Sequence, residues 1–61
     1  MKRRDLIRHL EHHGCMLLRE GKHAIYGNGN RRAAVPRHTE IANLTAERIC
    51  DDLAIPRLEK K

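Results

Sequence analysis

Glycine and proline residues break the middle of the chain into segments that are too short for helices. The segments hold five or six residues each and comprise residues 15–20, 22–26 and 31–35. The run Gly27-Asn28-Gly29-Asn30 is typical of turns that join antiparallel strands, and Pro36 lacks the N–H group that an interior strand donates. We therefore expect three short strands, with a hairpin between the second and the third and an end to the third at Pro36.

Amphipathic helices are predicted on both sides of these strands. The first covers residues 3–13, where Leu6, Ile7 and Leu10 fall on one side and Gly14 follows at a position typical of a helix end. The second begins at about Asn43, the expected N-cap residue, and Ile55-Pro56 ends it. Its apolar positions recur at helical spacing and are Ala46, Ile49, Cys50 and Leu53.

The order helix, three strands, helix indicates an α+β fold. Two helices that each carry one apolar stripe need a common surface, and a small antiparallel meander offers one face to both while the other face meets solvent. We expect a single domain over residues 1–61, with a core from about residue 2 to 56 and a frayed, charged tail at 57–61.

Composition restricts the classes of function. The chain has 61 residues, and a chain of this size buries only about 60% of the surface that its unfolded form exposes, which disfavours an enclosed cofactor pocket. Its net charge of +5 favours a polyanionic partner such as a phosphate backbone. With one Tyr and no Phe or Trp, the aromatic platform of many single-strand RNA readers is missing. We expect no cofactor.

Cysteine usage and hydropathy give further expectations. Cys15 and Cys50 fit neither a disulfide framework nor a paired-cysteine zinc site, so we expect both in the core, in a protein of the reducing cytoplasm. No apolar run approaches the roughly 20 residues that span a bilayer, and nothing at the start resembles a signal peptide. His9 and His13 lie four residues apart on a helix, but a zinc site needs a third ligand, so we expect solvated histidines and no metal.

The segment Gly21-Lys22-His23-Ala24-Ile25-Tyr26 is the most plausible place for chemistry. It sets His23 on a predicted strand between glycine turns, beside Lys22 and the only aromatic residue. An imidazole has an ordinary pKa of about 6.5 and exchanges protons at neutral pH, while a lysine offers fixed positive charge to an anionic substrate. Strand periodicity leaves two arrangements open. If Ile25 packs under the helices, His23 lies at the rim of the sheet; if Tyr26 packs inward, His23 lies on the open face.

Several motifs along the chain, in order and spacing, resemble those of the HicA toxin family, also called YcfA-like. They are Asp5-Leu6-Ile7-Arg8-His9-Leu10, Gly14 before an apolar strand, Gly21-Lys22-His23 followed by Tyr26, Val35-Pro36-Arg37-His38, Glu40-Ile41, and Arg48-Ile49-Cys50-Asp51-Asp52-Leu53. The resemblance implies an αβββα fold like that of double-stranded-RNA-binding domains, cleavage of mRNA, and neutralisation by a HicB antitoxin. It also implies that the catalytic histidine of the Gly-x-His motif is His23.

The chemistry expected of such a toxin needs no metal. A general base removes the proton of the ribose 2′-hydroxyl, cations stabilise the charge that grows on the phosphate, and an acid protonates the leaving oxygen. We assign the base to His23 and RNA contacts to Lys22, Arg32, Arg37 and His38, the last also a candidate acid. Two alternatives stay open, namely a non-catalytic module that binds duplex RNA and a basic protein-interaction domain.

Overall fold

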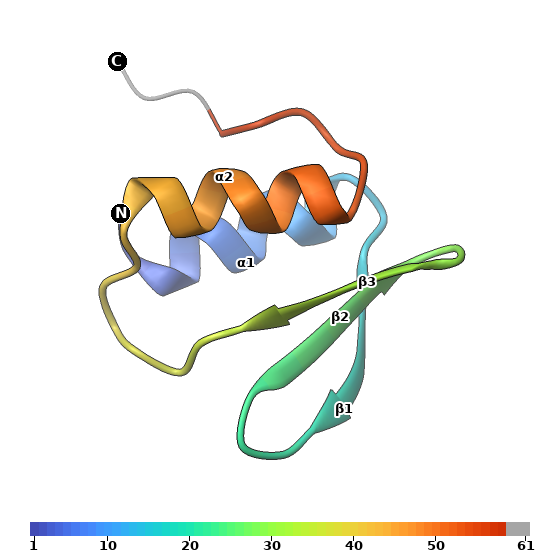
Figure 1. Cartoon of the computed structure of the whole chain (residues 1–61), viewed down its shortest axis with the longest axis horizontal. Helices are drawn as coiled ribbons and strands as arrows, with labels where there is room; N and C mark the ends of the chain where they lie inside the picture. The colour runs from blue at the N-terminus through green and yellow to red at the C-terminus, as the bar shows by residue number, and fades with distance from the viewer. Residues whose placement is uncertain (59–61) are drawn as a thin grey trace.

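The computed structural model describes residues 1–58 and forms one three-stranded sheet with two helices (Figure 1). The elements are α1 (Arg3–His12), β1 (Met16–Glu20), β2 (Ala24–Asn28), β3 (Arg31–Val35) and α2 (Asn43–Asp52). The sheet is antiparallel throughout, and β2 lies between β1 and β3. Figure 1 shows both helices on the same side of the sheet. The predicted α+β architecture, with its αβββα order, is confirmed.

A single apolar cluster lies between the helices and the sheet. The helices contribute Leu6 and Leu10 from α1 and Ala46, Ile49 and Cys50 from α2, and the sheet contributes Ala24, Tyr26, Ala33 and Val35. Both cysteines are free and buried, which confirms their predicted place in the core. Burial raises the pKa of the Cys50 thiol, and it also raises that of Cys15. Both thiols therefore stay protonated and unreactive at neutral pH.

The end of α1 follows the sequence pattern closely. Gly14 adopts a φ of 84°, in the left-handed region that glycine tolerates best. This conformation lets the N–H of Cys15 donate to the carbonyl oxygen of Leu10 at 2.9 Å, so the last turn of the helix keeps its hydrogen bonds while the chain turns into β1. Gly14 thus marks the end of the helix, as predicted.

The boundaries of α2 differ from the prediction at both ends. Ala42 occupies the N-cap position and Asn43 is already helical, so the predicted N-cap role of Asn43 is wrong. The helix ends at Asp52, earlier than the Ile55-Pro56 stop, because Ala54 turns left-handed with a φ of 57°. The side-chain amide of Asn28 donates to the carbonyl oxygen of Leu53 at 2.8 Å. This bond satisfies a carbonyl group that the end of a helix would otherwise leave unpaired.

The strand β2 begins two residues later than predicted, at Ala24 instead of Lys22. Only Gly29 and Asn30 form the turn of the hairpin, because Asn28 already pairs with Arg31. Gly29 has a φ of 64°, as two-residue hairpin turns require. The shift moves His23 off the strand and into the connection between β1 and β2. We call this connection, residues 21–23, the His23 turn.

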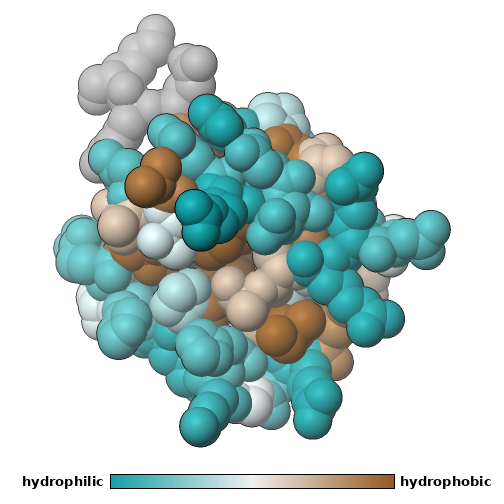
Figure 2. Space-filling model, in the orientation of Figure 1, coloured by the Kyte–Doolittle hydropathy of each residue, from teal (hydrophilic) through white to brown (hydrophobic). Residues whose placement is uncertain are grey.

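The packing of Tyr26 decides which face of the sheet meets the helices. Tyr26 is buried with Ala24, whereas Ile25 is only half-buried and faces the open side. Of the two arrangements that strand periodicity allows, the structure therefore has the one with Tyr26 inward, although His23 lies in the turn before β2 and not on the strand itself. Figure 2 shows that the surface on the side of α2 is largely hydrophilic, with apolar groups in small islands. Within residues 1–58, neither helix has the length and apolar character needed to cross a membrane.

The segment after α2 is anchored rather than frayed at Arg57. The Arg57 guanidinium donates to both carboxylate oxygens of Asp51, at 3.1 and 2.8 Å, and lies 3.7 Å from Glu47. The hydrogen bond from Arg57 lowers the pKa of the Asp51 carboxyl group. Leu58 is half-buried, and residues 59–61 of the predicted tail lie outside the described residues.

Candidate functional site

The His23 turn presents its side chains to solvent. His23 and Lys22 are both exposed, and His23 stands directly before the first residue of β2. Within the turn, the N–H of Gly21 donates to the carbonyl oxygen of His23 at 3.3 Å. The imidazole of His23 is therefore accessible to a large substrate, with a lysine as its neighbour in the same turn.

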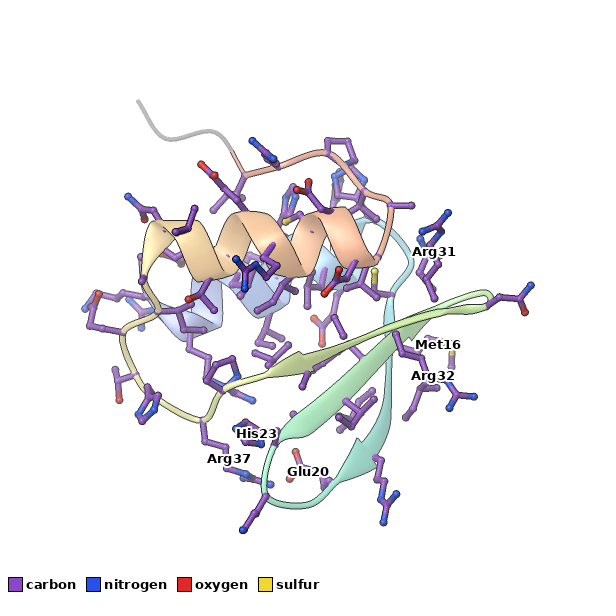
Figure 3. All side chains as sticks on the ribbon, in the orientation of Figure 1. Met16, Glu20, His23, Arg31, Arg32 and Arg37 are labelled. Atoms are coloured by element: carbon purple, nitrogen blue, oxygen red, sulfur yellow. The ribbon has the colours of Figure 1, made fainter. Side chains whose placement is uncertain are left out.

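Arg37 connects the segment after β3 to the His23 turn. Its Nε and Nη2 atoms donate to the carbonyl oxygen of Gly21 at 3.1 and 2.9 Å, and Nη2 also pairs with Glu20 Oε1 at 2.6 Å. Figure 3 shows the side chains of Glu20, His23 and Arg37 together at this end of the sheet. The exposed ion pair contributes only about 0–1 kcal/mol. The two donors on the Gly21 carbonyl add a second contact, which restrains the peptide group of the turn.

His38 lies in the segment that connects β3 to α2. His38 is exposed. Because it directly follows Arg37 in the chain, the Cα atoms of the two residues are about 3.8 Å apart. The anchoring of Arg37 on Gly21 brings this segment to the His23 turn. Three of the five residues that the sequence singled out thus gather at the His23 turn, namely Lys22, His23 and Arg37, and His38 is the chain neighbour of Arg37.

Arg32 lies in another part of the molecule. It pairs with Gly27 on β2, four residues beyond His23, which corresponds to a separation of about 13 Å along a strand. Figure 3 shows Arg32 at the opposite end of the sheet from His23, near Met16 and Arg31. Arg32 lines a depression of about 610 Å³ on the open face, together with Leu18, Arg19, Ile25, Ala33 and Ala34. The structure does not bring Arg32 to the imidazole.

The strand β1 exposes large apolar side chains that are not part of the core. Met16, Leu17 and Leu18 are 67%, 45% and 51% exposed, and β1 is an edge strand that pairs only with β2 in the part of the chain that the structure describes. A contiguous exposed apolar segment on an edge strand is typical of a surface that another chain covers. The apolar run is visible in the sequence, but its exposure is seen only in the folded structure.

A basic hollow adjoins the site at Arg37. It has a volume of about 370 Å³ and is lined by Lys2, Arg3, Arg4, Arg37 and Thr39. Sequence reasoning assigned no function to residues 2–4, although the run of three cations was the signal that could have found them. Their closeness to Arg37 arises because the start of α1 pairs with the segment after β3, through a bridge between Lys2 and Glu40.

The three histidines at the end of α1 form a separate cluster. The rings of His9 and His13 meet edge to face with centroids 4.6 Å apart, and His12 lies 5.3 Å from His13. Partial burial, together with the charges of His9 and His12, lowers the pKa of His13. His9 Nε2 lies 2.7 Å from the carbonyl oxygen of Pro56. Among residues 1–58, no three His, Cys, Asp or Glu side chains are grouped to hold a metal ion.

Comparison with known proteins agrees with the resemblance seen in the motifs. Residues 3–55 match the family described as HicA toxin of bacterial toxin-antitoxin. No curated protein and no solved structure gave a significant match. The matched segment begins with α1, ends just beyond α2 and includes the His23 turn and the Arg37 segment. Because this match covers most of the chain and both helices and all three strands, the protein belongs to the HicA toxin family of bacterial toxin–antitoxin systems.

Proposed function

We propose that this toxin is a metal-independent endoribonuclease that cleaves mRNA, with His23 as the general base. The observation that carries the proposal is the accessible imidazole of His23, in a turn that Arg37 restrains and that Lys22 makes positive. Cleavage of mRNA would stop translation and arrest growth, as expected of a toxin that acts during stress in the cytoplasm.

The reaction needs two proton transfers, one from the attacking 2′-hydroxyl group and one to the leaving 5′-oxygen. A neutral His23 removes the proton of a ribose 2′-hydroxyl, and the resulting 2′-oxygen attacks the adjacent phosphorus. The bond from phosphorus to the 5′-oxygen breaks, and that oxygen takes a proton from an acid, for which His38 is our candidate. The products are a 2′,3′-cyclic phosphate and a free 5′-hydroxyl. General base catalysis of this kind contributes typically about 10²- to 10⁴-fold in rate.

Positive charge at the turn stabilises the transition state. Lys22 stands beside His23, makes no side-chain hydrogen bond or ion pair with the described residues, and is exposed. It is therefore available for the charge that grows on the phosphate oxygens, where loss of one well-placed donor costs about 3 to 4 kcal/mol. We assign Arg37 a positioning role, because its donors already hold Gly21 and Glu20, and we assign Arg32 to contacts with more distant parts of the RNA.

The partner of this toxin is proposed to be a HicB-type antitoxin protein. The family pairs toxins with antitoxins, and such a partner must block the approach of RNA to His23. The exposed apolar side chains of β1 support a docking site close by, because β1 leads directly into the His23 turn. A net charge of +5 favours an antitoxin surface that is acidic around its apolar contacts.

The experiment compares the wild-type protein with His23→Ala and, as a matched control, His12→Ala, another histidine to alanine change far from the turn. Each protein is incubated with a defined RNA in the presence of a chelator, and the ends of the fragments are identified. We expect cyclic phosphate ends from wild type and from His12→Ala, and no fragments from His23→Ala.

Binding distinguishes the proposal from a non-catalytic RNA-binding module. His23→Ala should bind RNA with the same dependence on salt as wild type, because the substitution leaves the cations in place. Wild-type protein that binds duplex RNA but never cuts any RNA would support the non-catalytic alternative instead. Cleavage that the chelator abolishes would contradict the metal-independent mechanism.

A further inference from the structure

The basic hollow beside the His23 turn is lined almost entirely by cations. Four of its five lining residues carry positive charge, the fifth is a threonine, and no carboxylate or apolar side chain from residues 1–58 lines it. Two carboxylates adjoin the hollow without lining it: Glu20 pairs with Arg37 at 2.6 Å, and Glu40 lies 3.7 Å from the amino group of Met1. The backbone N–H of Arg3 donates to the carbonyl oxygen of Thr39 at 2.8 Å, so the two segments that form the hollow are joined.

Two of the cations are fixed by the protein and two are not. The Nε atom of Arg3 donates to the carbonyl oxygen of Pro36 at 2.8 Å, and Arg37 is held on Gly21 and Glu20. Lys2 and Arg4 are exposed, and their side chains form no hydrogen bond or ion pair with any described residue. The hollow therefore combines a rigid cationic wall with two cations that keep all their donors for a ligand. Such a concentration of like charge repels itself unless an anion binds there.

We propose that the basic hollow binds phosphate groups of the RNA backbone. This inference rests on the proposed function and adds a binding site, Lys2 and Arg4 with Arg3, Arg37 and Thr39, to the residues around His23. Contacts to nucleic-acid backbones come mainly from arginine, lysine and hydroxyl side chains, which is the set present here. Arginine also matches the geometry of a phosphate with two parallel hydrogen bonds.

The lining favours phosphate over an acidic protein segment. Protein interfaces have an apolar or aromatic centre, and the hollow has none. The open-face depression around Ile25 and Arg32, by contrast, mixes apolar and cationic side chains. Arg37 belongs both to the hollow and to the contact that restrains the His23 turn. An RNA strand held by the hollow therefore meets Arg37, the residue that also holds the His23 turn.

The test measures binding of a fluorescent single-stranded RNA whose 2′-hydroxyls are all methylated, so that it is not cleaved. Affinities are determined over a range of salt for wild type, for Lys2→Ala/Arg4→Ala and for the control Arg31→Ala/Arg48→Ala. The control removes the same charge from exposed arginines at the β2–β3 hairpin and on α2, outside the hollow. Thermal unfolding of each variant checks that the fold is intact.

We expect the log–log salt slope of the hollow variant to be shallower than that of wild type by about 1.4, which corresponds to two lost phosphate contacts at about 0.7 each. The control variant should keep a salt slope close to that of wild type. Arg4→Lys should also keep most of the wild-type slope, because the positive charge remains. Equal changes in the two double variants would overturn the proposal, because only overall charge would then matter.

Two further measurements separate this inference from the proposed function. If unmodified RNA is cleaved through His23 but the hollow variant keeps the wild-type slope, the hollow is not the binding site and the nuclease remains. If the slope falls as expected without any cleavage, the hollow is confirmed and the nuclease is wrong. Binding of poly-L-glutamate that the hollow variant loses, with RNA binding unchanged, would assign the hollow to an acidic protein and overturn the phosphate assignment.

Discussion

The guanidinium of Arg37 donates two hydrogen bonds to the carbonyl oxygen of Gly21, a residue 16 positions earlier in the chain. This relationship joins the end of β3 to the turn that carries His23. Two donors on one carbonyl restrain both the position and the direction of the peptide group, which a single point charge does not do. The orientation of the His23 turn therefore depends on a residue that lies outside the turn.

Arg37→Lys should reduce cleavage more than it reduces RNA binding. The lysine keeps the charge but loses the planar fork that holds Gly21, so the His23 turn becomes less ordered. We expect kcat to fall by about 10- to 100-fold with a smaller change in KM, because misplacement of a catalytic group affects mainly the chemical step. Glu20→Gln is the control, since it removes only an exposed ion pair. Equal losses of kcat in both variants would contradict the role of the Gly21 contact.

Gly27→Ala should disturb the open face of the sheet through Leu18. A Cβ atom at Gly27 would lie within van der Waals overlap of Leu18 Cδ1, but Leu18 is half exposed and its side chain can rotate away. We expect a loss of about 1 kcal/mol in the free energy of unfolding, at the low end for overpacking. In the double variant with Leu18→Ala, the two losses should be less than additive, as urea denaturation would show. Strict additivity would mean that the two residues are not in contact.

Asn28→Ala should loosen the attachment of the hairpin to the end of α2. The substitution removes the hydrogen bond from the Asn28 amide to the carbonyl oxygen of Leu53, which spans 25 residues. We expect a loss of about 1 kcal/mol in the free energy of unfolding, measured in urea. Asn30→Ala, in the exposed turn of the same hairpin, is the matched control and should change stability by less than about 0.5 kcal/mol. A similar loss in both variants would indicate an effect of the turn and not of the bond.

Stability should fall as the pH is lowered below about 6.5, the ordinary pKa of histidine. The pKa of His13 is lowered in the folded protein, by partial burial and by repulsion from His9 and His12. Between the lowered pKa and the ordinary one, the unfolded chain binds a proton that the folded chain does not, so acid favours unfolding. Urea midpoints at pH 7.5 and 5.5 should differ in wild type and differ less in His13→Gln. The Asp51 carboxyl group titrates in a lower range and does not interfere.

Met16→Glu should weaken the antitoxin complex without reducing toxicity. Met16 is 67% exposed on the edge strand β1, and a carboxylate there disfavours burial under a partner protein. We expect at least a 10-fold loss of affinity for the cognate antitoxin and weaker relief of growth arrest. Leu44→Glu is the control, because Leu44 is equally exposed at 70% but lies on α2. If Leu44→Glu weakens the complex and Met16→Glu does not, the antitoxin docks on α2 and not on β1.

The order and type of the elements could be predicted from the sequence, because they depend on residues that are close together along the chain. Leu6, Leu10, Ile49 and Cys50 recur at helical spacing, and their burial follows from that spacing alone. Gly14 and Pro36 ended their elements because their backbones restrict what the next residue can do. The exact end of β2 was missed, because a run of four turn-forming residues does not specify which two form the turn. Pairing of Asn28 with Arg31 decides that, and the pairing is a property of the whole hairpin.

By itself the sequence determined the order of elements, the core side of each helix, the positive charge and His23 as the candidate base. The roles of Lys22, His23, Arg32, Arg37 and His38 in catalysis and RNA binding stay predictions. Only the tertiary structure decided that Tyr26 faces inward, that Arg37 holds Gly21, and that residues 2–4 share a hollow with Arg37. The physical reason is distance along the chain: periodicity reports on neighbours within a helix or strand, whereas these contacts join segments that meet only after the sheet and helices have packed together.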